Sequence, residues 1–194
     1  MAFDVGSMDE IHEICKIMYS DFANGFKFCP KCSSITFHTE DNGRSLRCEE
    51  CHFNYFINNS AAVACLITNN LGELLLTRRA FMPNQGMLDL PGGFVEPLES
   101  AEMAAVREIR EELNLNIVKL KYLISYPNLY HYSGINIPTV DLAFVCEVES
   151  LECLKPDDDV ASVEFVDPEK IDFKALCAVS MEKIIRFYLN WSKL

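Results

Sequence analysis

The sequence predicts an α/β protein in which a small cysteine-rich module precedes a larger domain of mixed strands and helices. Four of the nine cysteines form two close pairs in the N-terminal third of the chain. Beyond them, strand-like apolar segments are combined with two segments of helical periodicity. Nearly half of the 194 residues are hydrophobic, so the chain can bury one core of moderate size beside a small module.

The N-terminal segment carries apolar side chains at helical spacing. Residues 8–20 place them at i, i+3, i+4 and i+7: Ile11, Ile14, Cys15 and Met18. We expect residues 1–25 to contain an N-terminal helix that packs on the neighbouring module or on a partner chain. The cysteine module is assigned to residues 26–56, and the larger domain to residues 57–194.

The paired cysteines have the spacing of a metal site. Cys29 and Cys32 form the first pair, and Cys48 and Cys51 form the second, in the pattern C-x2-C-x15-C-x2-C. This pattern is typical of four thiolates that hold a structural zinc ion in a tetrahedral shell. A disulfide scaffold is the alternative, but no export signal supports an oxidising compartment.

A short hairpin is predicted inside the cysteine module. Strand-like residues 33–39 and 45–48 flank the turn 41–43, Asp-Asn-Gly, which suits a zinc ribbon. Four thiolates fill the shell, so His38 and His52 are expected to lie outside it. The remaining cysteines follow no ligand spacing and are expected to be buried, inert thiols: Cys15, Cys65, Cys146, Cys153 and Cys177.

The larger domain alternates strands with helices. Strands are expected at residues 61–68, 73–78, 118–125 and 140–148. Gly134 and Pro138 interrupt the segment between the last two strands and predict a loop there. Residues 173–191 have the pattern of a terminal amphipathic helix, whose inward side chains are expected to be Leu176, Val179, Ile184, Phe187 and Tyr188.

One helix of the larger domain places three carboxylates on one side. It is predicted to start after Ser100, a good N-cap, and to end at Asn114. Glu108, Glu111 and Glu112 stand at i, i+3 and i+4. Because these like charges repel, the face is either simply solvated or offset by a divalent cation such as Mg²⁺ or Mn²⁺. Another stripe is apolar: Ala105, Val106, Ile109 and Leu113.

The residues around this helix match a known motif. The run from Gly93 to Leu115 resembles the Nudix box, G-x5-E-x7-R-E-U-x-E-E-x-G-U, in which U is aliphatic. The departure is Asn114 at the second Gly, where Asn tolerates the same left-handed backbone. The resemblance covers residues 61–190 and implies an α/β/α sandwich with a mixed sheet. The matching residues are Gly93, Glu99, Arg107, Glu108, Ile109, Glu111, Glu112 and Leu115.

The resemblance implies metal-dependent hydrolysis of the pyrophosphate bond in a nucleoside diphosphate linked to another group. The implied ligands of Mg²⁺ or Mn²⁺ are the Gly92 carbonyl and the carboxylates of Glu99, Glu108, Glu111 and Glu112. Glu99 can also orient its loop, and Arg107 is expected to orient the glutamates. The alternative is a nucleotide sensor, although sensors of this family usually lose the box glutamates that this chain keeps.

The general base is either a box glutamate or an acid from a later loop. The late candidates are Asp157, Asp158, Asp159 and Glu164, for which a solvated acidic loop is the favoured interpretation. A zinc ribbon before a Nudix domain resembles the NADH pyrophosphatase subgroup, but its S-Q-P-W-P-F-P-x-S signature survives only in part at residues 125–130. NADH, ADP-ribose, FAD, CoA and dinucleoside polyphosphates therefore remain open. The candidate substrate contacts are Tyr126, Tyr130, Tyr132 and Arg79.

The acidic character of the chain limits its partners. The formal net charge is -12 and the sequence pI is near 4.7, whereas nucleic acids and anionic membranes attract basic surfaces. We therefore expect a small-molecule nucleotide substrate, with no nucleic acid and no membrane partner. The absence of a signal-peptide pattern predicts a cytoplasmic location. The aromatic loop can also belong to a homodimer interface.

Overall fold

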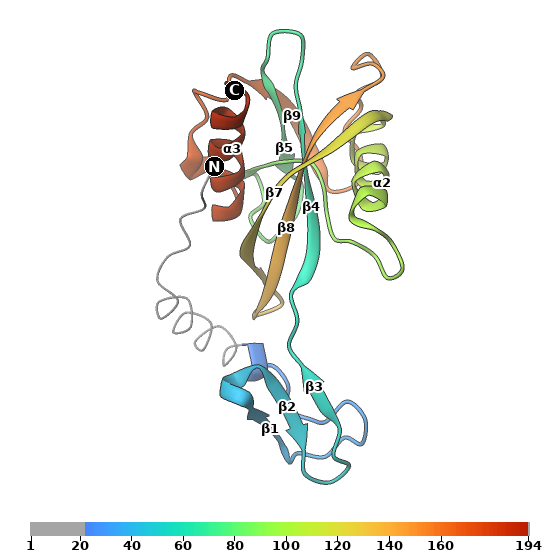
Figure 1. Ribbon diagram of the computed structural model, residues 1–194, viewed down its shortest axis with the longest axis vertical. Coiled ribbons are helices and arrows are strands. Elements are labelled where there is room, and N and C mark those ends of the chain that lie inside the picture. The colour runs from blue at the N-terminus through green and yellow to red at the C-terminus, as the bar shows by residue number, and fades with distance from the viewer. Residues whose placement is uncertain (1–21, 194) are drawn as a thin grey trace. The chain divides into compact units, whose positions relative to one another are not determined.

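The structure, a computed structural model, describes residues 22–193, which form two compact units (Figure 1). The described part of the first unit comprises residues 22–59 and 129–138. The second unit comprises residues 60–128 and 139–193. The N-terminal helix expected from residues 8–20 lies outside the described residues.

The first unit is built on a three-stranded antiparallel sheet in the order β1-β2-β3. Its elements are β1 (Phe37–Glu40), the 3-10 turn η1 (Asp41–Gly43), β2 (Ser45–Cys48) and β3 (Asn54–Phe56). The predicted hairpin is therefore present, and β3 extends it by one strand. The small core beneath the sheet contains Ala23, Cys29, Phe37, Leu46, Cys48 and Ile57.

A long hairpin of the larger domain contributes its tip to this first unit. Strands β7 (Ile117–Tyr132) and β8 (Ile135–Val148) are joined through Ser133 and Gly134, both at positive φ. The Ile135 side chain packs so closely on Gly25 that a Cβ on Gly25 would lie 2.8 Å from Ile135 Cδ1. The prediction of a loop between residues 125 and 140 is therefore wrong. The two strands continue through this segment, because its tyrosines favour extended backbone.

The second unit contains two further three-stranded sheets. One has the order β4-β8-β7, in which β4 (Ser60–Ile67) runs parallel to β8. The other has the order β6-β5-β9, in which β5 (Leu74–Arg79) pairs antiparallel with β6 (Leu88–Asp89) and β9 (Val160–Val166). A bridge between Thr68 and Leu74 links β4 to β5. The result is a mixed sheet layer.

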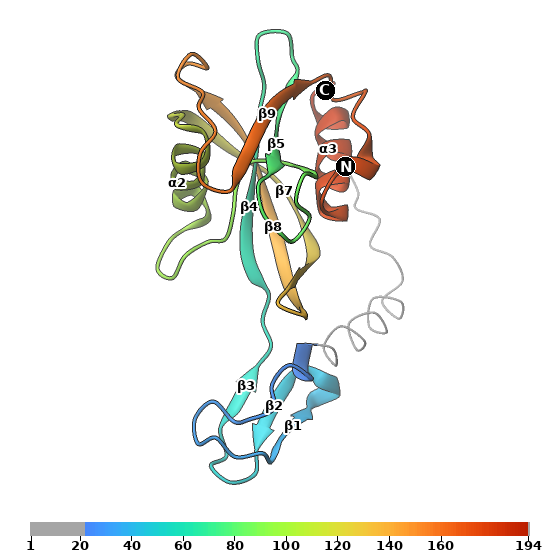
Figure 2. The same cartoon turned by 180° about the vertical axis from the view of Figure 1, so that it is seen from behind.

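Two helices cover opposite faces of this layer, as Figures 1 and 2 show from both sides. Helix α2 (Ala101–Leu113) packs on a core cluster with Val63, Cys65 and Phe144. Helix α3 (Val179–Trp191) packs on the other cluster. This arrangement is the predicted α/β/α sandwich. Neither described helix has the length and apolar composition needed to cross a membrane.

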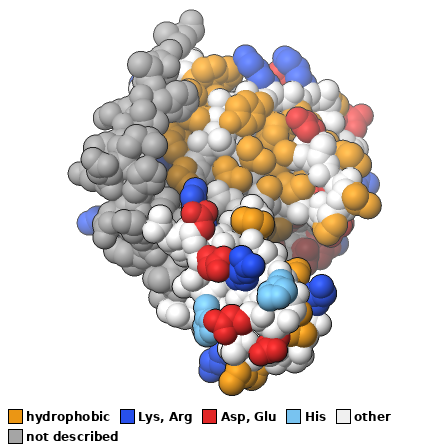
Figure 3. Space-filling view, turned by 60° about the horizontal axis from the view of Figure 1, so that its bottom comes forward, with side chains coloured by type: hydrophobic (Ala, Val, Ile, Leu, Met, Phe, Trp, Pro, Cys, Tyr) orange, Lys and Arg blue, Asp and Glu red, His pale blue; other side chains and the backbone are white. Residues whose placement is uncertain are grey.

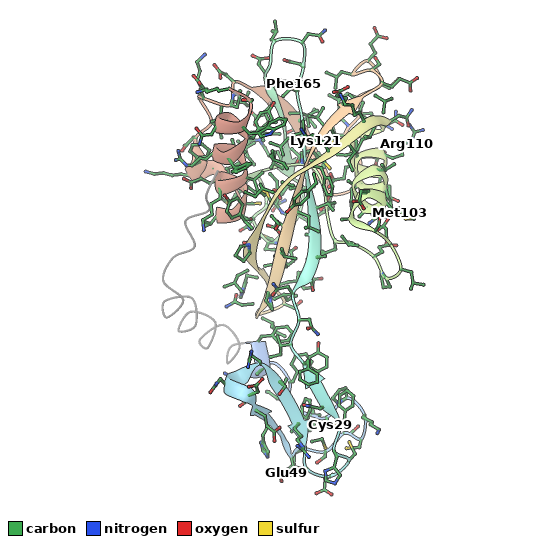
Figure 4. All side chains as sticks on the ribbon, in the orientation of Figure 1. Cys29, Glu49, Met103, Arg110, Lys121 and Phe165 are labelled. Carbon is green, nitrogen blue, oxygen red and sulfur yellow. The ribbon has the colours of Figure 1, made fainter. Side chains whose placement is uncertain are left out.

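Helix α2 begins and ends where the sequence predicts. The Ser100 side chain accepts a hydrogen bond from the Met103 backbone N–H at 3.2 Å, and Asn114 adopts φ 57° at the C-terminal end. Ile109 and Leu113 are fully buried, whereas Val106 is 46% exposed, so its predicted inward position is wrong. Val106 lies at the edge of the apolar stripe. Figure 4 shows Met103 and Arg110 on the outer side of the helix.

The terminal helix is shorter than predicted. A 3-10 turn η2 (Phe173–Ala175) precedes it, because the Asp172 side chain accepts a hydrogen bond from the Lys174 N–H and closes a local turn. Helix α3 then starts at Val179, which is 67% exposed in the first turn rather than inward-facing. The predicted core contact of Ile184 is confirmed, since its side chain is fully buried.

Candidate metal and active site

The loop between β6 and α2, helix α2 and the loop before β9 surround a cavity of about 280 Å³, called here the acidic cavity. Its lining combines five carboxylates with one guanidinium, one aromatic ring and two glycines. These residues are Gly92, Gly93, Phe94, Glu96, Arg107, Glu108, Glu112, Asp158 and Asp159. Five carboxylates thus face a single guanidinium, and a hollow with this excess of acidic groups suits a divalent cation.

Glu112 is the most enclosed carboxylate of the cavity, with 5% of its surface exposed. Its Oε2 accepts a hydrogen bond from the Gly92 backbone N–H at 2.9 Å. Burial raises the pKa of Glu112 well above its ordinary value, and the nearby charge of Asp159 raises it further. Burial also raises the pKa of Glu108, which stands one helical turn earlier. A divalent cation would favour both ionised forms.

Gly92 is required by the close approach of the loop to the sheet. It adopts φ 143°, and a Cβ at this position would lie 2.1 Å from the Val63 carbonyl oxygen. Gly93 is also constrained, since a Cβ there would lie 2.5 Å from Glu108 Oε1. The two glycines therefore let backbone groups reach the carboxylates of α2 directly.

Arg107 organises the acidic loop and the helix. Its Nε and Nη2 donate to the two carboxylate oxygens of Glu99 at 3.0 and 2.9 Å. Its Nη1 donates to Glu108 at 2.8 Å and to Glu111 at 3.1 Å, while Nη2 also donates to the Phe94 carbonyl at 3.0 Å. These contacts lower the pKa of Glu99 and raise that of Arg107. The geometry suits an orienting role for Arg107.

The structure separates the three box glutamates that the sequence groups together. Glu108 and Glu112 line the acidic cavity, whereas Glu111 is outside the lining and its side chain is 51% exposed. Glu99 is held by Arg107 and accepts from the Glu96 N–H at 3.0 Å, which suits the loop-orienting role predicted as its alternative.

The loop before β9 brings further acids to the cavity. The Asp157 N–H donates to the Glu112 carbonyl oxygen at 2.8 Å, which positions Asp158 and Asp159 in the lining. Asp159 lies close enough to Glu112 for its charge to raise the pKa of Glu112. Asp157 itself is exposed beside Lys155, and Glu164 pairs with Arg78. The favoured expectation of a solvated loop therefore fits Asp157 but not Asp159.

The candidate substrate contacts lie elsewhere, since none of them is among the residues that line the acidic cavity. Tyr126 packs partly buried against the α3 core, with Lys183 Nζ 5.8 Å from its ring centre. Tyr130 and Tyr132 stack with ring centres 6.0 Å apart and belong to the first unit. Arg79 donates to the Pro83 carbonyl at 3.0 Å and to Asp89 at 3.4 Å. Sequence reasoning did not single out Phe94 or Glu96 as lining residues, although both follow the glycine turn.

The four paired cysteines converge in the first unit, with their sulfur atoms all within 4.8 Å of one another. Cys29 and Cys51 are 3.7 Å apart, and Cys32 and Cys48 are 3.5 Å apart, measured between Sγ atoms. A tetrahedral zinc ion with Zn–S bonds of about 2.3 Å places its sulfurs about 3.8 Å apart, whereas a disulfide needs about 2.05 Å. The donor set therefore fits zinc.

The thiols of the cysteine cluster differ in acidity. Although a backbone hydrogen bond from Ser34 lowers it, hydrogen bonds shared with the neighbouring thiols raise the pKa of Cys32 to about 12. The pKa of the Cys48 thiol is lowered to about 7, chiefly because it accepts a hydrogen bond from the Cys51 backbone N–H. His38 and His52 lie outside the cluster and line a separate hollow of about 270 Å³ with Glu40, Arg47 and Glu49. Figure 3 shows acidic, basic and histidine side chains interspersed on this part of the molecule.

The other described cysteines differ in burial. Cys65 and Cys146 are buried in the core as predicted. Cys177 is partly buried beside Asp89, and burial raises the pKa of its thiol. Cys153 is exposed, so its predicted burial is wrong; it lies in the turn after β8, where its carbonyl accepts a hydrogen bond from the Asn114 side chain at 3.1 Å. Cys15 lies outside the described residues.

Comparison with known proteins places the chain in a family. Residues 58–187 match the NUDIX domain model. An ADP-ribose pyrophosphatase of Methanocaldococcus jannaschii is 34% identical over 142 residues, which cover 72% of this chain and 78% of that protein. A NAD-capped RNA hydrolase NudC of Pseudomonas aeruginosa is 26% identical over 160 residues, which cover 80% of this chain but only 54% of that protein.

Solved structures agree at the level of the fold. The crystal structure of a NUDIX hydrolase from Nitrosomonas europaea has a TM-score of 0.64 at 23% identity, covering 85% of this chain and 91% of that one. The sandwich and the box helix define a hydrolase of the Nudix class. The chain belongs to the Nudix family and is a Nudix pyrophosphohydrolase.

Proposed function

We propose that the protein hydrolyses the pyrophosphate bond of a small nucleoside diphosphate linked to a second group, of the ADP-ribose or NADH type. The observation that carries this proposal is the acidic cavity, where Glu108 and Glu112 are drawn out of water beside the glycine turn. The name of one relative, an ADP-ribose pyrophosphatase, supports the substrate class, and a second relative is named as a hydrolase of NAD-capped RNA. FAD, CoA and dinucleoside polyphosphates are the other members to test.

The residues of the cavity fit a hard divalent cation. Carboxylate oxygens of Glu108 and Glu112, with the carbonyl of Gly92, form a ligand set of the type that Mg²⁺ and Mn²⁺ prefer. When bound, the cation offsets the phosphate charge and lowers the pKa of a ligated water. The hydrogen bonds of Arg107 to Glu99 and Glu108 fix the position of the loop relative to the helix. Glu111 accepts a hydrogen bond from Arg107 and thereby helps to orient that guanidinium.

Water attacks one phosphorus of the pyrophosphate, a new P–O bond forms, and the bond from that phosphorus to the bridging oxygen breaks. The products are two phosphomonoesters. We assign the proton of the attacking water to the carboxylate of Asp159, which lines the cavity beside Glu112. Its position makes Asp159 a better candidate for the base than the exposed Asp157.

The zinc ribbon is proposed to be structural. Four thiolates complete a tetrahedral shell and leave no open position for catalysis. We therefore assign Zn²⁺ to Cys29, Cys32, Cys48 and Cys51, and Mg²⁺ or Mn²⁺ to the acidic cavity. The proposed domains are an N-terminal helix at 1–25, the ribbon at 26–56 and the Nudix domain at 57–194.

A substrate panel tests the proposed function. Purified protein with Mg²⁺ or Mn²⁺ is incubated with ADP-ribose, NADH, FAD, CoA and a dinucleoside polyphosphate, and the phosphomonoester products are identified. A NAD-capped RNA belongs in the panel, because one relative is named for that activity; our expectation of no nucleic-acid substrate predicts slower turnover of it. Hydrolysis of none of these compounds would refute the proposal.

A further inference from the structure

The loop between β5 and β6 displays two large apolar side chains to solvent. Phe81 is 63% exposed and Met82 is 74% exposed, next to each other in the chain. Exposed apolar side chains in single positions are common, but an adjacent aromatic and thioether pair on one short loop is a larger apolar feature. Other apolar side chains are exposed as well, among them Leu71 and Leu98, but Phe81 and Met82 are adjacent and together offer a contact surface for a ligand of apolar character.

The loop that carries this pair is held firmly in place. Gln85 Nε2 donates to the Ala80 carbonyl at 2.8 Å, and Arg78 Nη1 donates to the Gly86 carbonyl at 2.8 Å. Further backbone bonds close the loop at its base and middle, from Gly86 to Arg79 and from Met87 to Asn84. The side chains of Arg79 and Asn84 add bonds to the Pro83 and Cys177 carbonyls. The apolar pair is thus presented by a preorganised backbone.

The start of the loop is bonded to a segment that lines the acidic cavity. The Ala80 backbone N–H, immediately before Phe81, donates to the carbonyl oxygen of Asp159 at 2.7 Å. Asp159 lines the cavity beside Glu112. The lining suits metal ions and phosphate oxygens, but it offers one aromatic ring, Phe94, to the rest of a nucleotide. A planar, weakly polar base needs apolar surface next to the phosphate site.

We propose that Phe81, with Met82 beside it, contacts the nucleobase of the substrate while its pyrophosphate occupies the acidic cavity. The proposal rests on the proposed function and adds a determinant of substrate specificity. A ring face stacks on a base through dispersion and burial, and a thioether packs favourably at the edge of an aromatic system. Contact with the base contributes equally to ground state and transition state, so it should act on KM.

The kinetic test compares Phe81→Ala with Leu71→Ala. Leu71 is 82% exposed in the turn at the opposite end of β5, so it matches Phe81 in exposure but not in position. Loss of one stacking contact should raise KM for ADP-ribose about 10-fold with little change in kcat. KM for the same diphosphate without its adenine should stay near the parent value in both variants. Phe81→Tyr, which keeps the ring, should restore the parent KM.

A binding measurement covers the case in which Phe81→Ala does not fold. Phe81→Trp and Leu71→Trp are titrated with the non-hydrolysable methylene analogue of ADP-ribose in the presence of Mg²⁺, and tryptophan emission is followed. Quenching in Phe81→Trp above that in Leu71→Trp supports the proposal. Equal emission changes, together with a KM in Phe81→Ala equal to that in Leu71→Ala, would overturn it and leave a protein partner as the occupant. Absence of turnover by the parent refutes the proposed function instead.

Discussion

Replacing Glu112 by Gln removes one negative charge from the acidic cavity and keeps the shape of the side chain. Glu112 is 5% exposed and accepts from the Gly92 N–H at 2.9 Å. The Gln amide oxygen can accept the same hydrogen bond, so the glycine turn should stay in place. Under the proposed function, the lost component is the charge that would hold a divalent cation beside Glu108.

The expected cost is a fall in turnover of about 10²- to 10³-fold, roughly 3 kcal/mol, which is the usual effect of removing one preorganised electrostatic element. The structure predicts a smaller loss for Glu111→Gln, because Glu111 is half exposed and lies outside the cavity lining. Glu102→Gln is the matched control, since Glu102 is an exposed glutamate in the first turn of the same helix.

The same substitution has an opposite effect on the metal-free fold. Burial raises the folded-state pKa of Glu112, so the neutral form is favoured by folding. Its contribution to the free energy of unfolding is fully present below the unfolded pKa and is lost as pH rises through the folded pKa. Glu112→Gln should therefore raise the thermal midpoint of Mg²⁺-free protein at about pH 8, with little difference at about pH 4.

Turnover and thermal midpoints of the parent and the three variants provide the assay. The substrate is whichever panel compound the parent hydrolyses, at saturating Mg²⁺. A Glu112→Gln enzyme within about threefold of the parent would refute the assignment of Glu112 to the metal site. Equal losses in Glu111→Gln and Glu112→Gln would show that burial in the cavity does not distinguish the two residues.

Three further predictions follow from the two sites. Removal of Mg²⁺ and Mn²⁺ should abolish hydrolysis while zinc stays bound, because the cavity offers hard oxygen ligands and the ribbon offers thiolates; activity in the absence of both ions would contradict this. Elemental analysis should find about one zinc per chain, and disulfides among the four cysteines would contradict this assignment. Cys29→Ser should reduce solubility more than turnover, since zinc can contribute on the order of 10 kcal/mol to the folding of a small module. Asp159→Asn should lower turnover about 10²-fold, as expected for loss of a general base, whereas Asp157→Asn should stay near the parent. Turnover and pH–rate profiles of both variants test this, and a larger loss in Asp157→Asn than in Asp159→Asn would contradict it.

The sequence by itself determined the features that depend on local spacing. Helix α2 starts at Ser100 and ends at Asn114 because capping and left-handed geometry are properties of a few consecutive residues. The four-cysteine pattern likewise identified a cluster whose sulfurs meet within 4.8 Å. The Nudix box identified the family, since its fixed positions lie on one loop and one helix.

Only the tertiary structure decided which acids share a low-dielectric environment. Glu111 and Glu112 are neighbours in the chain, yet only Glu112 is covered by the glycine turn and by the loop before β9. Asp159 reaches that place through backbone bonds of its loop to residues far away in the sequence, at Ala80 and, from Asp157, at Glu112. Burial depends on contacts between segments that are distant in the sequence. Helical periodicity predicts which side chains share a face of the helix, but not which other segment covers each of them.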